Sequence, residues 1–206
     1  MAKILDKGGI LLALFFGAVL YLAGGPAYLG LMLFFFLLAI GVTRYEHEIK
    51  RDLGLYEHER GWENVLSNGL LPSALAVLSP AIGPIPFIAS MAAVTADKFG
   101  SEVGVLDPKD PLYIFDLKPV KPGTSGAMSV LGTIASLGGS CMVGLCAMFL
   151  FGINPTQALL VGLAGLVGSL IDTLFGVLEE KGIGTKGTTN FICSIAGALI
   201  GYYFIP

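Results

Sequence analysis

The sequence has little charge: only 13% of its 206 residues are charged, whereas 54% are hydrophobic. It lacks the basic arm with which many proteins bind nucleic acid. Its three cysteines all lie inside apolar runs, where we expect reduced packing residues and not disulfides or metal ligands. His47 begins the stretch HEIKR, which lacks the second histidine of an HExxH zinc site. These absences argue against a nucleic-acid-binding protein, a disulfide-stabilised domain and a zinc protease.

Long apolar runs fill the rest of the chain, and the mean hydropathy is +0.80. One bilayer span needs about 20 mostly apolar residues, so the chain has room for six or seven. We therefore predict an all-α, polytopic membrane helix bundle forming a single domain over residues 1–206, with the first run an anchor helix and not a cleaved signal. The seven expected helices are 9–24, 27–42, 64–78, 87–97, 125–151, 155–178 and 188–204. Those at 64–78 and 87–97 are short for a span, so part of this hairpin could be buried in protein instead of facing lipid.

The twelve Lys and Arg residues all fall on one side of this seven-helix arrangement. They precede the first helix or lie in the connections 44–63, 98–124 and 179–187, whereas the opposite connections near Gly25, Ile82 and Asn154 carry no charge. The positive-inside rule makes the charged side cytoplasmic. The sequence thus predicts an integral protein of the cell membrane with its N-terminus inside, its C-terminus outside and its polar site facing the cytoplasm.

Small residues recur every four positions in several of the apolar runs. Examples are Gly132, Ser136, Ser140 and Gly144 in one run and a GxxxG pair in the last. Such ridges let helices approach closely in lipid, and we interpret them as packing residues.

Asp172 is the one charged residue inside an apolar run. An acid in a membrane helix is costly and normally faces a cavity or a partner. Glu180 lies eight residues further on, so about 12 Å of helix separates Asp172 from the cytosolic end. We expect Asp172 to have a functional role; the alternative is a structural ion pair or a protonated core acid.

Asp97, Ser101 and Glu102 stand at the start of the central polar segment. Carboxylate oxygens suit Mg²⁺, which is usually bound by one or two carboxylates together with substrate phosphates. We expect Asp97, Glu102 and Asp172 to converge around Mg²⁺ as the metal-binding and catalytic acids. The alternative is a solvated helix end in which Lys98 pairs with Glu102 four residues on.

Lys121 begins a stretch that resembles an anion site at a helix start, since glycines expose N–H groups and helix N-termini favour anions. It is not a Walker A loop, and a similar opening, 186–190, starts the last helix. The alternative is that both are ordinary Ser/Thr N-caps. The expected nucleotide- and phosphate-binding residues are Arg60, Asn68, Ser101, Lys121, Gly123, Thr124, Ser125, Gly126, Ser129, Thr133 and Asn190. For Asn68, a bond to another helix is as good an interpretation as a bond to a ligand.

The ordered set of these motifs resembles the phytyl-phosphate kinase family of integral membrane proteins. The resemblance runs from Arg60 to Asn190 through Asn68-Gly69, Asp97…Ser101-Glu102, Pro122-Gly-Thr-Ser-Gly126 and Gly168-Ser-Leu-Ile-Asp172-Thr. The family is similar to phytol kinases, dolichol kinases and CDP-lipid synthases, which use CTP and Mg²⁺. The resemblance implies transfer of the γ-phosphate of CTP to phytyl or geranylgeranyl phosphate, giving the diphosphate.

Two other functions remain open from the sequence. One is another CTP-using lipid enzyme, a polyprenol kinase or a CDP-lipid synthase; the other is a small-solute or proton transporter with Asp172 as its coupling site. Transporter sites usually lie near the midplane, whereas Asp172 is expected nearer the cytosolic surface and the far half of the bundle has no charged side chain. The expected partners are CTP or another nucleoside triphosphate, a prenyl phosphate and membrane lipid, without nucleic acid, and the sequence leaves room for a homodimer.

Overall fold

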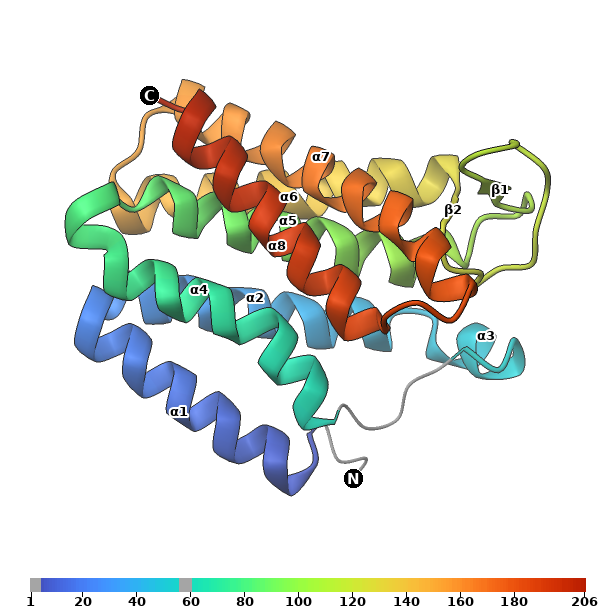
Figure 1. Cartoon of the computed structure of the whole chain (residues 1–206), viewed down its shortest axis with the longest axis horizontal. Helices are drawn as coiled ribbons and strands as arrows, with labels where there is room; N and C mark the ends of the chain where they lie inside the picture. Colours follow the sequence, from blue (N-terminus) through green and yellow to red (C-terminus); the bar gives the residue numbers. More distant parts are fainter. Residues whose placement is uncertain (1–4, 56–60) are drawn as a thin grey trace.

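The computed structural model describes residues 5–55 and 61–206, and these residues form an almost entirely helical bundle (Figure 1). Seven long helices and one short helix account for most of the described chain. They are α1 Lys7–Gly24, α2 Pro26–Arg44, α3 His47–Asp52, α4 Trp62–Ile82, α5 Ile85–Gly104, α6 Val130–Phe151, α7 Pro155–Glu180 and α8 Lys186–Phe204. The helical membrane bundle expected from the sequence is confirmed.

The α4–α5 hairpin is longer than the sequence pattern indicated. The expected helix 64–78 continues through Pro80 to Ile82, and the expected helix 87–97 continues to Gly104. The two helices have 21 and 20 residues, so neither is short for a span. The polar end of α5 stays helical because it packs on α6, where a Cβ atom on Gly104 would lie 3.2 Å from the Gly132 Cα atom.

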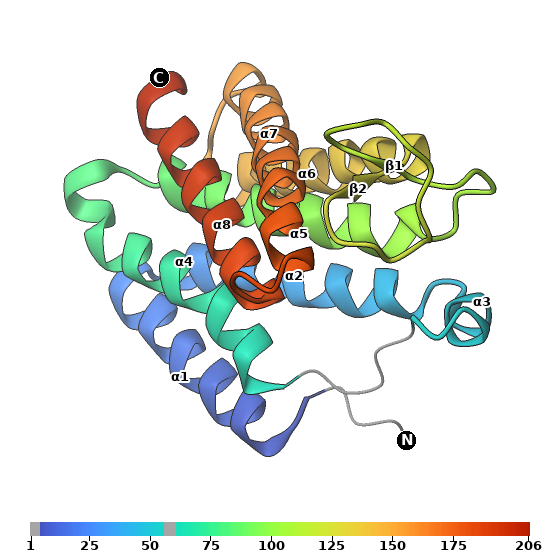
Figure 2. The ribbon, with the colours of Figure 1, turned by 45° about the vertical axis from the view of Figure 1, so that its right-hand side comes forward.

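Helix α5 lies in the middle of the bundle, packed against α6, α7 and α8 (Figures 1 and 2). Every residue from Pro86 to Ala96 is buried. Five helices, α1, α2, α4, α6 and α7, are long and apolar enough to cross a membrane. Because other helices and not lipid cover α5, its alanine- and serine-rich sequence needs no strong hydropathy.

Small residues bring the helices into contact, as their spacing predicted. A Cβ atom on Gly197 of α8 would lie 2.6 Å from the Ala89 carbonyl oxygen of α5, and one on Gly165 of α7 would lie 2.9 Å from the Ala92 backbone. No side chain fits at such distances, so the backbones themselves are in contact.

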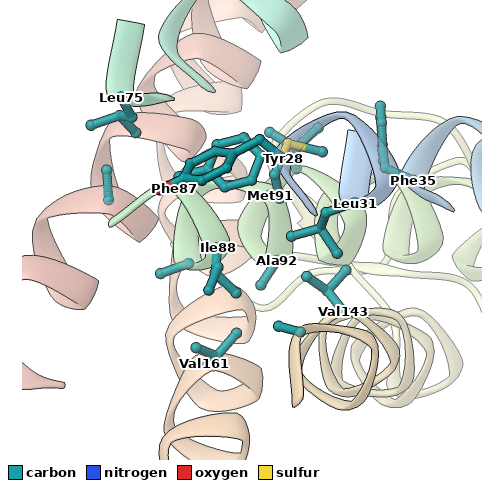
Figure 3. Close-up of a cluster of buried hydrophobic side chains, with 14 of the residues drawn as sticks. Tyr28, Leu31, Phe35, Leu75, Phe87, Ile88, Met91, Ala92, Val143 and Val161 are labelled. Atoms are coloured by element: carbon teal, nitrogen blue, oxygen red, sulfur yellow. The ribbon is translucent and has the colours of Figure 1, made fainter. Parts of the chain in front are cut away.

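A hydrophobic core fills the half of the bundle around the α1–α2, α4–α5 and α6–α7 turns (Figure 3). Tyr28 of α2 lies 4.6 Å from Phe87 of α5 and 5.0 Å from Phe151 of α6, measured between ring centroids. This half of the bundle is therefore apolar and closely packed.

The other end of the bundle carries α3, the α5–α6 connection and the α7–α8 turn (right-hand side of Figure 1). The α5–α6 connection contains a small antiparallel pair, β1 Leu112–Tyr113 and β2 Ala127–Met128, that the sequence did not predict. The expected start of a helix at residue 125 is wrong, because α6 begins at Val130. Gly126, with φ of +79°, has a left-handed backbone that cannot continue a right-handed helix.

Candidate active site

A pocket of about 460 Å³ opens at this polar end of the bundle. We call it the polar-end pocket. Its walls come from the polar half of α5, the start of α6, the last turns of α7, the start of α8 and the 122–129 segment, with Gly54 and Leu55 after α3 at its rim. Helices distant in sequence thus contribute to one cavity. The hydrophobic core lies further along the bundle, towards its other end.

The carboxyl groups of Asp97 on α5 and Asp172 on α7 lie next to each other in this pocket. We call them the carboxylate pair. One oxygen of Asp172 is buried and has no hydrogen-bond partner among the described residues. A buried polar atom without a partner is costly, and two adjacent acids repel each other if both are ionised. The arrangement therefore favours a bound cation or a proton at this position.

Lys186, in the first turn of α8, lines the same pocket, and its charge acts on both members of the carboxylate pair. Thr189, one turn further on, is buried beside Asp172. Lys186 was absent from the expected site residues, although it stood in the 186–190 stretch that drew attention as a helix opening. It reaches the pair because α8 packs against both α5 and α7.

The carboxylate pair fits a hard divalent cation. Two carboxylates offer oxygen ligands, and the unpartnered oxygen of Asp172 is available for coordination. Within residues 5–55 and 61–206, however, no three His, Cys, Asp or Glu side chains form a metal cage. A Mg²⁺ ion held by this pair would therefore take its remaining ligands from water and substrate phosphates, as Mg²⁺ commonly does.

Glu102 does not join the carboxylate pair, which corrects the expected three-acid site. Its Oε2 atom accepts from the Lys50 ammonium at 2.9 Å, and its Oε1 atom accepts from the Thr43 hydroxyl at 2.8 Å. It also forms an ion pair with Lys98, four residues earlier on α5. Lys50 is only 1% exposed. Glu102 is thus held in a network that fastens α2 and α3 to the end of α5, even though it also lines the pocket.

The glycine-rich stretch around 123–126 lines the pocket but is not a helix N-terminus. It forms a turn before β2, and the backbone N–H of Ser125 donates to the Glu180 carboxylate of α7 at 2.8 Å. Thr124 uses its hydroxyl locally, donating to the Lys121 carbonyl oxygen at 2.8 Å. The Glu180 carboxylate therefore already accepts from the Ser125 N–H, one of the N–H groups expected to face a phosphate.

The hydroxyls near the start of α6 act mainly as caps. Ser129 is the N-cap of α6, accepting from the Gly132 N–H at 3.0 Å and donating to the Gly104 carbonyl oxygen at 3.2 Å. The Thr133 hydroxyl donates to the Ser129 carbonyl oxygen at 2.9 Å. Thr185 caps α8 in the same way, with Thr188 completing the capping box. The N-cap interpretation therefore holds at both helix starts, although Ser129 and Thr133 also line the pocket.

Of the remaining expected residues, Ser101 alone lines the pocket among those that the structure describes. Asn68 does not line the pocket; its side-chain amide donates to the Asn64 carbonyl oxygen of its own helix at 2.9 Å. Asn190 is buried and its side-chain oxygen has no partner among the described residues, but it is not part of the pocket wall. Lys121 is exposed outside the lining, and Arg60 lies outside the described residues. Ser101 lines the pocket and donates to the Lys98 carbonyl oxygen at 3.3 Å.

Asp107 ties the central connection to the start of α6. Its carboxylate accepts from the Leu131 N–H at 3.0 Å and from the Lys109 N–H at 3.1 Å. These backbone bonds, that of Leu131 first, lower the pKa of Asp107 below its usual value. The central connection is thereby anchored to the start of α6 by a half-buried acid.

Comparisons with known proteins place this arrangement in a family. The family model described as "Integral membrane protein DUF92" matches residues 1–198. The chain is 37% identical to the uncharacterized membrane protein MJ0933 of Methanocaldococcus jannaschii, over 97% of this chain and 85% of that protein. It is 32% identical to Protein PGR of Arabidopsis thaliana, over 97% and 77%, and 25% identical to Protein VTE6, chloroplastic, of the same plant, over 96% and 63%.

No solved structure matches the chain. The family match covers nearly the whole sequence, including α5, α7 and the start of α8, which supply Asp97, Asp172 and Lys186. The chain belongs to the family of integral membrane proteins DUF92.

Proposed function

We propose that the protein is a kinase that transfers the γ-phosphate of CTP to a prenyl phosphate, such as phytyl or geranylgeranyl phosphate. The observation that carries the proposal is the carboxylate pair with Lys186 in a pocket at the polar end of a membrane bundle. The resemblance of the motifs to the phytyl-phosphate kinase family supports the choice of acceptor. The clustering of basic residues at the same end supports a cytoplasmic site.

The residues of the chain have positioning and electrostatic roles in this proposal. An oxygen of the acceptor's phosphate attacks the γ-phosphorus, the bond from that phosphorus to the β–γ bridging oxygen breaks, and CDP leaves with the electron pair. An acceptor phosphate needs no strong base, because a phosphate monoester is largely ionised at pH 7. Asp97 and Asp172 hold Mg²⁺, which neutralises phosphate charge when bound, and Lys186 orients the transferred group.

The test is a transfer assay with purified protein in lipid vesicles, Mg²⁺ and geranylgeranyl phosphate. With γ-labelled CTP we expect a labelled prenyl diphosphate, identified by its mass. Label from α-labelled CTP in the lipid product would instead indicate a CDP-lipid synthase, and transfer to the free alcohol but not the phosphate would indicate a polyprenol kinase. A lipid fraction without label from either nucleotide, with ATP and GTP also inactive, would contradict the proposal.

Lys186→Met provides a sharper test of the site, with Lys181→Met as its control. Both lysines are exposed, but Lys186 lines the pocket and its charge acts on the carboxylate pair, whereas Lys181, at the end of α7, does not line it. Removing a cation that stabilises transferred charge is expected to lower kcat about a hundredfold or more. Lys181→Met should stay within about twofold of the wild type, because exposed substitutions away from a site have small effects. Equal rates for the two variants would remove Lys186 from the site.

A further inference from the structure

The polar-end pocket reaches the seam between α6 and α7, which lie side by side (Figures 1 and 2). Thr133 on α6 and Leu166, Leu170 and Thr173 on α7 line the pocket, and all four are half-buried. Each of these side chains thus borders the cavity and keeps part of its surface accessible.

Two contacts flank this part of the seam. Towards the core, the Ser136 and Ser169 hydroxyls lie 3.4 Å apart. Towards the polar end, a Cβ atom on Gly176 would lie 2.7 Å from the Gly126 nitrogen, so the 122–126 turn closes onto α7. Seven residues, about 10 Å of helix axis, separate Ser169 from Gly176. We call the stretch of the α6–α7 seam between these two contacts the seam window.

The surroundings of the seam window are apolar outside and charged inside. Ile134 and Leu137 on α6 and Leu163 on α7 are 63%, 36% and 45% exposed, on helices apolar enough to lie in a membrane. Asp172 lies between Ser169 and Gly176 in sequence, so the carboxylate pair is level with the window. A ligand that used both sides would need a charged head and a long apolar chain.

We infer that the seam window is the entrance and tail-binding site for an isoprenoid phosphate that arrives sideways from the bilayer. Its phosphate lies in the polar-end pocket beside Lys186, and its chain passes between Thr133 and Leu170 into lipid. This inference rests on the proposed function for the identity of the head group. Leaving the isoprenoid tail in lipid keeps its apolar surface out of water, which is favourable, so the protein needs no further cavity to hold the tail.

The first experiment compares two acceptors in a plugged variant. Leu170→Trp fills the window, and Val167→Trp, on the exposed outer face of the same helix, is its control. With geranylgeranyl phosphate in vesicles, we expect Leu170→Trp to lower kcat/KM at least about tenfold. The loss with the short, soluble dimethylallyl phosphate should be at least about threefold smaller, because its apolar part is too short to pass through the window. Thr133→Phe, which plugs the window from the other helix, should repeat the pattern if Leu170→Trp folds poorly.

The second experiment locates the chain directly. A geranylgeranyl phosphate analogue with a diazirine on its tail is photolysed with wild-type protein in vesicles, and the labelled residues are identified by mass spectrometry. We expect label at Leu137, Leu163 and Leu170. Label concentrated on α1, α2 or α4, or equal loss of both acceptors in the plugged variants, would overturn the inference. Label at the window without transfer to either acceptor would reject the proposed kinase activity and leave the lipid site standing.

Discussion

Asp97 and Glu102 lie five residues apart on α5, yet their surroundings are opposite. Glu102 has a partner on each oxygen: Lys50, Lys98 and the Thr43 hydroxyl satisfy it. Asp97 instead faces another acid, Asp172, one of whose oxygens has no partner among the described residues. Removing one partner of a satisfied buried charge destabilises a fold, whereas an incompletely satisfied acid pair has a free-energy cost that a ligand can relieve.

The difference follows from which neighbours each acid receives. The short helix α3 folds back so that Lys50, itself donating to the Val42 carbonyl oxygen at 2.8 Å, ends at Glu102. Asp97, just over one helical turn before Glu102, lies beside α7 and α8. These helices bring Asp172 and Lys186 close to it. The comparison therefore leads us to expect a structural role for Glu102 and supports the proposed role of the carboxylate pair, and each expectation can be tested separately.

Substitution of Asp172 should have the largest effect on activity. Asp172→Asn keeps the shape but removes the charge, and losing a metal ligand is expected to cost several kcal/mol of transition-state stabilisation. We therefore expect transfer to fall at least about a thousandfold. The free energy of unfolding without nucleotide should stay equal or rise, because an amide is less costly than an acid next to Asp97. Both are measured on the same preparation, with the exposed Asp110→Asn as control.

Near-normal turnover of Asp172→Asn at saturating CTP and Mg²⁺ would refute its catalytic assignment. Lost stability, with activity falling only in proportion to folded protein, would show that Asp172 has a structural role like that of Glu102.

Substitution of Lys50 should have the reverse pattern. Lys50→Met leaves Glu102 with fewer partners in a buried network and is expected to lower the free energy of unfolding by about 3 kcal/mol. The control Arg51→Met changes a neighbouring, exposed cation and should stay within about 0.5 kcal/mol of the wild type. Denaturant unfolding in detergent measures both.

A second substitution checks the cause. In the double variant Lys50→Met with Glu102→Gln, the unpaired charge is gone, so part of the lost stability should return. If the double variant is as unstable as the sum of the two single variants, the ion pair is not the reason for the loss.

The sequence predicted the parts of this comparison that depend on local pattern. Hydropathy located the seven long helices, small-residue spacing located their contacts, and a lone acid in an apolar run singled out Asp172. The sequence could not predict that Glu102 bonds Lys50 and does not join the carboxylate pair. Lys50 is 52 residues away and reaches Glu102 only because of how α3 folds. Lys186 was missed for the same reason: its reach depends on how α8 crosses α5 and α7.

The start of α6 shows another limit of sequence patterns. The run from 125 is apolar and small enough for a helix, but the pairing of β2 with β1 and the cap by Ser129 move the start to Val130. Both depend on contacts between segments and not on residue preference. The expected anion site at 123–126 was wrong as a helix N-terminus because it relied on that start.

A third acid, Asp107, completes the comparison with the smallest expected effect. It is half-buried, and its bond to Leu131 joins residues 24 apart and holds the central connection to α6. Its pKa is lower in the folded protein, so its contribution to stability is present at neutral pH and is lost as the pH falls through about 4 and below. Asp107→Asn should therefore lower the melting temperature slightly at pH 7, and the difference from wild type should shrink in acid. Asp116→Asn is the matched control: its pKa is also lowered, but its bonds reach only Lys118, two residues away, so a loss as large as that of Asp107→Asn would show that the link to α6 contributes nothing.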